Sequence, residues 1–343
     1  MAPTIDVRAA APPGSDFAPL MRRIREAGLL DRRRVHYARL IALNALAYGA
    51  VWAGVVVLGN SWWALLLAVP AAVFTARTCF LGHDAGHAQI ARTRRANRLL
   101  GLVHGNLMIG MSYGWWTDKH NRHHANPNHV DKDPDVAPGV LVWTEGQAEG
   151  RGGAAARWFT RNQARMFFPL LLLEGINLKV SGVRGLRDRP PRERALEAVL
   201  LAAHAAWYFG LLFTVMSPVH AVVFIVVHQG LLGLHLGCSF APNHKGMAMP
   251  DPEQRLGHLE RQVLTSRNVR GGPVVDWMLG GLNYQIEHHL FPNMPRPNLR
   301  HAQPVVRAHC AATGLPYAEA GVADSYAQAL RHMDNVGEAA GPR

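Results

Sequence analysis

Two long stretches of the chain contain almost no charged side chains, and this feature limits the folds that the chain can adopt. The segment from Leu40 to Ala76 carries no charge, and between Arg194 and Lys245 the only charged residue is Glu197. A helix that crosses a bilayer needs about 20 mostly apolar residues, so each stretch is long enough for two such helices joined by a tight turn. We therefore expect four membrane-spanning helices in two hairpins, at residues 38–58, 62–82, 196–215 and 218–240.

The remaining composition agrees with a membrane protein. Charged residues make up 17% of the chain, whereas about 25% is usual in soluble domains. The alternative, very apolar core helices of a soluble protein, is disfavoured because such helices seldom remain uncharged over two consecutive elements. The turns near residues 59–61 and 217–218 lack Lys and Arg, whereas residues 1–39 carry eight Arg. The positive-inside rule then predicts cytoplasmic termini and a cytoplasmic central segment, in the plasma membrane if the chain is bacterial.

The basic excess and the flanking segments complete this outline. Lys and Arg number 36 against 24 Asp and Glu, giving a net charge of +12, which suits a surface attracted to anionic lipid. No aromatic-basic module indicates a nucleic-acid partner. We expect residues 1–37 to form a disordered leader and an interfacial amphipathic helix, residues 38–317 a single domain, and residues 318–343 a C-terminal tail. The apolar segments at 166–173 and after Arg98 are too short to span, so we expect them at the membrane interface.

Histidines are the second unusual feature, with 19 in the chain. Three clusters lie next to the predicted membrane segments, all on the predicted cytoplasmic side. Residues three or four apart on a helix share one face, so the first cluster predicts a two-ligand clamp and the second a three-ligand clamp. The third cluster repeats the second's spacing with glutamine in the first slot. These clusters are His83 with His87, then His120 with His123 and His124, and finally Gln285 with His288 and His289.

Seven clustered histidines predict a site for more than one metal ion. Imidazole suits zinc, copper and iron, and a single zinc takes at most four ligands. The three cysteines have no CxxC spacing and exclude a cysteine-rich site. A dinuclear iron centre that binds and reduces O2 is the expected assignment. A dinuclear zinc hydrolase is the alternative, but such sites typically add bridging carboxylates. We interpret Asp84 and Glu287, inside the clusters, as acceptors that orient imidazole N–H groups.

The motifs resemble those of the membrane-bound fatty-acid desaturases. His83–His87 reads HDAGH, His120–His124 reads HNRHH and Gln285–His289 reads QIEHH, and these boxes accompany two hydrophobic hairpins. Trp116 stands four residues before the second box, and the sequence DPD at 133–135 follows it. The third box resembles that of the front-end, acyl-lipid type, in which glutamine replaces the first histidine. The resemblance extends from about residue 17 to residue 317.

This resemblance implies an all-α integral membrane fold whose cytoplasmic helical cap carries a dinuclear, histidine-rich metal site. It implies two iron ions, O2 as co-substrate, and a cis double bond introduced into a long acyl chain carried by CoA or lipid. It also adds a histidine at the end of the fourth span, where His235 is a weaker candidate than His244. Gln285 and Asn243 are then accessory or water-holding groups. The implied metal ligands are His83, His87, His120, His123, His124, His244, His288 and His289.

The resemblance also bears on partners. Many front-end members carry a fused cytochrome domain with an HPGG motif, which this sequence lacks. We therefore expect a ferredoxin or a small cytochrome with a flavin reductase as external electron donor. Basic residues that could contact the substrate head group, or simply be solvated, are Lys119, Arg122, Arg296 and Arg300. Three alternatives stay open: a fatty-acyl hydroxylase or epoxygenase on the same scaffold, a non-catalytic protein that stores or senses metal, and a haem protein.

Overall fold

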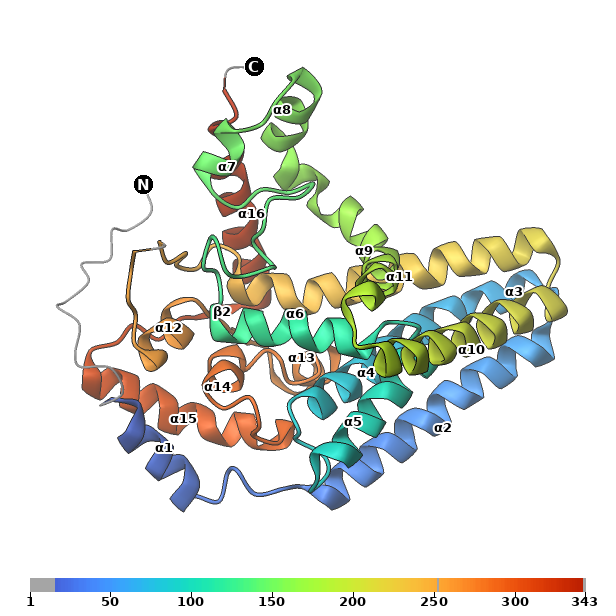
Figure 1. Ribbon diagram of the computed structural model, residues 1–343, viewed down its shortest axis with the longest axis horizontal. Coiled ribbons are helices and arrows are strands. Elements are labelled where there is room, and N and C mark those ends of the chain that lie inside the picture. Colours follow the sequence, from blue (N-terminus) through green and yellow to red (C-terminus); the bar gives the residue numbers. More distant parts are fainter. Residues whose placement is uncertain (1–15, 252, 342–343) are drawn as a thin grey trace.

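The computed structural model describes residues 16–251 and 253–341, so residues 1–15 of the segment predicted to form a leader and an interfacial helix (residues 1–37) lie outside them. The described chain is mostly helical, with one pair of short parallel strands. Long apolar helices extend to one end of the molecule, and shorter helices gather at the other end (Figure 1). We call the second region the cap. Its elements are α1 (Phe17–Glu26), α6 (Tyr113–Ala125), α7 (Glu145–Glu149), α8 (Ala154–Arg161), α12 (His258–Leu264), β1 (Asn268–Arg270), α13 (Gly272–Met278), α14 (Gln285–Leu290), α15 (Arg296–Thr313), β2 (Glu319–Gly321) and α16 (Val322–Glu338).

The long helices form two hairpins, as the uncharged stretches predicted. Ser61 and Ser217 begin the second helix of each hairpin, because each side-chain oxygen accepts a backbone N–H of the first turn. The two tips are tied together by a hydrogen bond of 2.9 Å from the Ser217 N–H to the Asn60 side chain. The four arms are α2 (Arg34–Leu58), α3 with α4 (Trp62–Leu66 and Ala68–Gly86), α10 (Pro191–Val215) and α11 (Pro218–His244).

These helices begin or end closer to the cap than the apolar stretches alone predicted. The first hairpin continues to Gly86 rather than residue 82, and the second to His244 rather than residue 240. The apolar segment ends where charged or polar side chains become frequent, but the backbone hydrogen bonds of the helix continue beyond that point. The added turns carry His83 and His244, so the two long helices deliver histidines directly into the cap.

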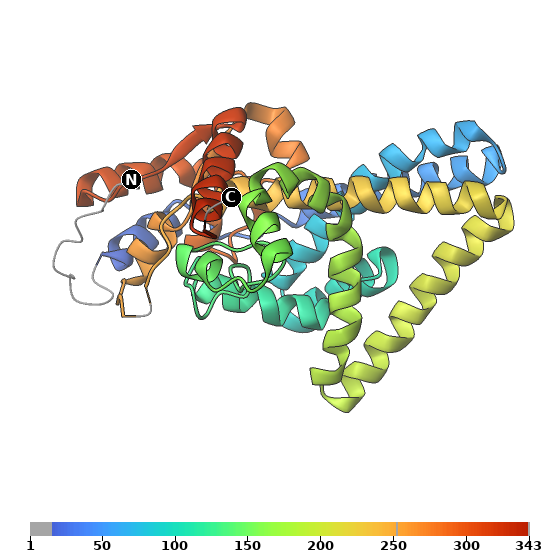
Figure 2. The ribbon, with the colours of Figure 1, turned by 90° about the horizontal axis from the view of Figure 1, so that it is seen from above.

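A fifth helix, α9 (Gln163–Gly185), continues through the short η2 (Leu186–Asp188). The combined segment 163–188 is also long and apolar enough to cross a membrane, whereas the sequence predicted only an interfacial stretch at 166–173. In both views α9 runs across α11 rather than alongside it (Figures 1 and 2). The crossing is close because Gly175 and Gly233 face each other there, each without a side chain.

The segment after the first histidine cluster turns back among the long helices. It consists of α5 (Arg94–Leu102) and the π-helix η1 (Val103–Ile109), and it ends at Gly110, whose φ of 73° is left-handed. The sequence predicted apolar residues here at a membrane interface. In the structure η1 contacts α4 and α10, and it joins directly to α6.

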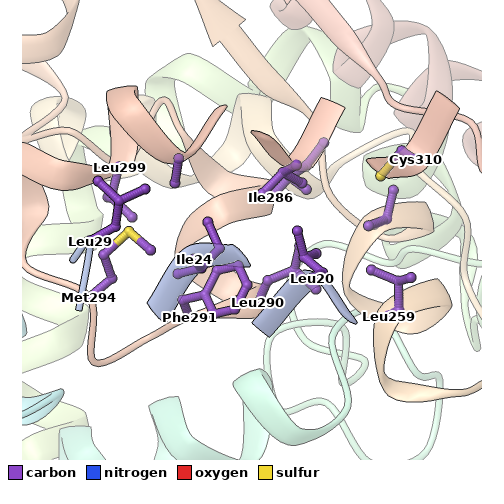
Figure 3. Close-up of a cluster of buried hydrophobic side chains, with 13 residues drawn as sticks. Leu20, Ile24, Leu29, Leu259, Ile286, Leu290, Phe291, Met294, Leu299 and Cys310 are labelled. Atoms are coloured by element: carbon purple, nitrogen blue, oxygen red, sulfur yellow. The ribbon is translucent and has the colours of Figure 1, made fainter. Parts of the chain in front are cut away.

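The cap has its own hydrophobic core. Leu20 and Ile24 of α1 are fully buried against α14 and α15, so the predicted amphipathic helix packs on the cap (Figure 3). The segment expected as a C-terminal tail forms β2 and α16 instead. Ala329, Met333 and Val336 recur at helical spacing, and their burial holds α16 in place.

The close crossing of α9 and α11 yields a testable prediction. A Cβ atom at Gly233 would lie 2.4 Å from the Leu171 carbonyl oxygen and 2.6 Å from the Gly175 nitrogen. At Gly230, on the same helix, the nearest atom is 3.7 Å away. We expect Gly233→Ala to lower the free energy of unfolding in detergent by about 1–3 kcal/mol, because two backbones must separate. Gly230→Ala is the matched control, and equal stability of the two variants would contradict the close crossing.

Candidate metal centre

The structure brings eight histidines from four helices into two adjacent groups. Within each group the nitrogen atoms that could bind a metal all lie within 4.8 Å of one another. The rings of His124 and His289, one from each group, stack with centroids 4.2 Å apart, so the groups share a boundary. The first group contains His83, His87, His120, His124 and His288, and the second contains His123, His244 and His289.

Helical spacing explains the first group. His83 and His87 stand four residues apart at the end of α4, and His120 and His124 stand four apart on α6. The Nε2 atom of His120 lies 2.9 Å from that of His87 and 3.1 Å from that of His124. His288 of α14 completes the group, with its Nε2 atom 3.1 Å from that of His124.

The second cluster is not the three-ligand clamp that the sequence predicted. His123 is not in the group that contains His120 and His124. It belongs to the second group, where its ring centroid lies 4.7 Å from that of His244 and 5.0 Å from that of His289. The prediction was wrong because neighbouring residues on a helix differ by about 100° in direction, and His123 and His124 therefore face different volumes. His288 and His289 diverge in the same way on α14.

Three other predicted site residues lie at different distances from these groups. The Gln285 side chain reaches the second group, with Nε2 2.8 Å from the His244 Nε2 atom. Asn243 is buried behind Gln285 and donates hydrogen bonds to the Ser239 and Leu282 carbonyl oxygens. His235 belongs to neither group, and its Nε2 atom bonds to the Met278 carbonyl oxygen at 2.7 Å.

The chemistry of the two groups fits metal binding. In the described chain, the buried Nε2 atoms of His83 and His289 have no hydrogen-bond partner, although both point into groups of other imidazoles. Burial, followed by the neighbouring histidines, holds the pKa values of His120, His124, His288 and His289 well below the ordinary value. These rings are therefore neutral at physiological pH, which is the form that binds a metal.

The opposite ring nitrogens are held by hydrogen-bond acceptors. The Nδ1 atom of His123 donates to Asp133 at 2.9 Å, and that of His244 donates to the Thr265 carbonyl oxygen at 3.0 Å. The Nδ1 atom of His289 donates to the Gln262 side chain at 3.0 Å. Such partners fix the orientation of the ring and leave Nε2 free to face inward.

The two acidic residues interpreted from the sequence as orienting groups differ in role. Asp84 contacts the His83 Nδ1 atom at 3.3 Å, as interpreted. Glu287, however, is bound by Asn268 and Tyr317 and makes no hydrogen bond to a histidine in the described chain. Burial raises its pKa to about 7. The interpretation failed for Glu287 because its side chain points to the far side of the short helix α14.

Sequence reasoning did not identify the roles of Asp133, Gln262 and Glu197. Asp133 was visible only as part of the DPD sequence, and Gln262 gave no signal. Glu197 was the one acid in an apolar stretch, which is a detectable signal. Its buried carboxylate accepts hydrogen bonds from Asn106, from the Ser112 hydroxyl at 2.7 Å and from the Gly114 N–H at 3.2 Å. It thereby fixes the first turn of α6, the helix that carries three of the histidines.

The four basic residues considered as contacts for the substrate head group differ in burial and in ion pairing. Arg296 is mostly buried, with an ion pair of 2.6 Å to Asp84, so it supports α4 rather than facing solvent. Lys119 pairs with Asp135, and the pKa of Lys119 is raised because this carboxylate outweighs the effect of burial. Arg122 and Arg300 are exposed.

A cavity of about 730 Å³ lies against the histidine groups. Four of the histidines line it together with Lys119, Asp135 and Lys245. Its other walls are largely apolar and come from α4, η1, α6, α9, α11 and the segment 134–143, including Ile109, Leu171 and Phe240. The cavity therefore offers an elongated apolar molecule a place beside the candidate metal ligands. The four histidines are His83, His120, His123 and His244.

Known proteins are similar in sequence to this chain over most of its length. The family model described as "Fatty acid desaturase" matches residues 60–321. An acyl-lipid (9-3)-desaturase from Physcomitrium patens is 29% identical over 95% of this chain and 63% of its own length. A Delta(6)-fatty-acid desaturase from Caenorhabditis elegans is 28% identical over 94% of this chain and 75% of its own length. A Delta(5) fatty acid desaturase from the same animal is 30% identical, over 91% and 72%. The chain thus spans less than two thirds of the length of the moss relative.

The hydrogen bonds of Asp133 yield a prediction about metal retention. Its carboxylate accepts from His123 and from the N–H groups of Asn128 and Asp135. Because all three partners are donors, the amide NH2 group of Asp133→Asn would face one of these N–H groups, and that hydrogen bond would be lost. We expect a 10–100-fold loss of metal affinity, measured by titrating the purified protein with Fe(II). Exposed Asp131→Asn is the control. Unchanged affinity of Asp133→Asn would exclude an orienting role.

Proposed function

The chain belongs to the fatty acid desaturase family, and we propose that it introduces a cis double bond into a long acyl chain at a pair of iron ions. The observation that carries this proposal is the convergence of eight buried or half-buried imidazoles beside a largely apolar cavity. We assign the first iron to the group around His120 and the second to the group around His123. Gln285 stands beside His244 in the second group and either binds the iron weakly or holds a water.

The bound iron pair would supply the activation of O2 and the removal of hydrogen from unactivated methylene groups. The chain's own residues do the rest. Asp133 and Gln262 hold the Nδ1 atoms of His123 and His289 and so keep these rings directed inward, and the apolar walls of the cavity exclude water from the reacting carbons. Overall, one acyl chain, one O2, two electrons and two protons give one alkene and two waters. This balance requires a donor, which we propose is a ferredoxin or a small cytochrome with a flavin reductase.

An acyl chain suits the cavity in polarity, because most of the lining is apolar. Lys119, Asp135 and Lys245 form a charged part of the cavity lining, and we propose that a polar acyl head on CoA or lipid lies there. The chain would pass the histidines and continue between η1 and α9. A methylene group has no polar handle, so its position is set only by distance along this cavity.

The long apolar helices support a location in a membrane, and we propose four spans. The helices α2, α10 and α11 and the combined segment 62–86 would cross the bilayer. We place α9 along the interface, since it runs across α11 and both of its ends lie away from the hairpin tips (Figure 2). The tips lack Lys and Arg, and the positive-inside rule therefore puts the cap and the histidines in the cytoplasm.

Cysteine accessibility tests this orientation. Asn60→Cys lies at a hairpin tip, and Gly152→Cys lies on an exposed loop before α8. In intact cells we expect a membrane-impermeant maleimide to label the first variant, and to label the second only after the membrane is permeabilised. The parent chain, whose three native cysteines are partly or fully buried, measures the background. The reverse pattern would place the histidines outside the cell.

Expression in a host without such enzymes tests the reaction. With a suitable donor supplied, fatty-acid methyl ester analysis should detect a product two mass units below its substrate. A product sixteen units above would instead indicate hydroxylation or epoxidation. An unchanged profile would contradict acyl oxidation.

Single substitutions test the ligand assignment. We expect His123→Ala or His288→Ala to abolish turnover and to lower iron below two per chain while the protein stays in the membrane, because each removes an inward-facing imidazole. Exposed His301→Ala is the matched control and should behave as the parent chain does. Full activity of either ligand variant would show that its assignment is wrong.

A further inference from the structure

The tip of η1 lies deep among the long helices. The Tyr48 hydroxyl donates to the Met108 carbonyl oxygen at 3.3 Å, and Tyr48 stands just past the middle of α2. The π-helix is a rare conformation that occurs frequently at functional sites. After Ile109, the left-handed Gly110 turns the chain back toward α6. The segment 94–111 therefore enters the apolar region and leaves it on the same side.

Side chains from three long helices hold this tip. The end of a helix leaves carbonyl groups without partners, which is costly where no water is present. The Leu107 carbonyl oxygen accepts from His204 Nδ1 and from Trp207 Nε1, both at 3.0 Å, and both donors belong to α10. The Ile109 carbonyl oxygen accepts from Lys179 Nζ of α9 at 2.6 Å. Each donor fixes the position of the tip, which is therefore a rigid part of the fold.

The same tip bounds the cavity beside the histidines. Ile109 is buried, with 3% of its surface exposed, and it lines the cavity together with Gly105 and Met111 of the same segment. Lys179 does not line the cavity and instead lies behind Ile109. The cavity is thus bordered both by histidines and by a hydrophobic residue whose carbonyl oxygen accepts a hydrogen bond from a lysine.

We propose that Ile109 is the floor of the acyl pocket and that Lys179 is a positioning residue that holds it there. Together they set how many methylene groups the pocket accepts beyond the metal centre. The proposal rests on the proposed function, since it takes an acyl chain to be the ligand. One methylene group too many for a hydrophobic pocket changes the preference between two chains by about 10–200-fold. A floor at a fixed position therefore limits the length of the chain that binds.

Binding of chains of graded length tests the floor without requiring turnover. The probes are two saturated series, acyl-CoAs and lysophosphatidylcholines, added to the purified full chain in detergent, and the readout is the rise in Tm against chain length. In the parent protein we expect this stabilisation to fall sharply beyond one length. Ile109→Ala removes three side-chain carbons and should move that limit to chains about two methylenes longer. Ile109→Phe should move it to shorter chains.

Ile176 provides matched controls. It lies on α9 with 47% of its surface exposed and does not line the cavity, so Ile176→Ala and Ile176→Phe should keep the parental limit. If the Ile109 variants also keep that limit, or if the parent protein shows no length dependence in either series, the floor proposal is overturned. Length-dependent binding without any oxidised product in the expression host would instead contradict the desaturase function and leave the floor in place.

Lys179 is tested by its donor group. Lys179→Met removes the hydrogen bond to the Ile109 carbonyl oxygen, and we expect the length limit to become broad while iron content stays at the parental level. Lys179→Arg keeps a donor and should restore a sharp limit. A merely structural lysine would lower Tm equally for all chain lengths. An unchanged, sharp limit in Lys179→Met would therefore overturn the positioning role.

Discussion

Eight imidazole rings must share a small buried volume, and most of the surrounding architecture satisfies this requirement. The Nε2 atoms of His87, His120, His124 and His288 face one another within the first group, while acceptors such as Asp133, Gln262 and the Thr265 carbonyl oxygen hold the Nδ1 atoms of the second group from behind. In the described chain Asp133 and Asp135 form a third group with His123, whereas the other two groups contain only histidines. Burial lowers the pKa values of these four rings of the first group and of His289, which favours the neutral form that binds a metal. Helix ends, the first turn of α6 and the core of the cap all serve to bring these rings together.

The sequence contained enough information to predict the elements that depend on local composition. A helix that faces lipid must be free of charged side chains, and this property can be read from the local composition. Both hairpins and their turns could therefore be predicted. The spacing of His83 with His87 and of His120 with His124 follows from the helical period, which is equally local. The ends of α4 and α11 could not be placed, because a hydropathy pattern reports where apolar residues stop and not where backbone hydrogen bonds stop.

Features that depend on contacts between distant segments were not predictable in the same way. His123 and His124 belong to different groups, and this could be predicted only from knowledge of the residues that lie on each side of α6. The return of η1 into the apolar region depends on Tyr48, Lys179 and His204, which lie on three other helices. The packing of α16 and the hydrogen bond from His289 to Gln262 both depend on contacts across the cap. The sequences of their own segments do not indicate them.

The two metal groups take neighbouring residues from the same helices: His123 and His124 on α6, and His288 and His289 on α14. Inserting or deleting one residue within either helix would turn everything beyond it by about 100° and disrupt both groups at once. A single side chain in either helix can therefore be replaced without moving the other ligands, whereas a change of register moves every ligand beyond it. The spacing of the boxes is in this sense frozen, while the rest of the chain remains free to diverge.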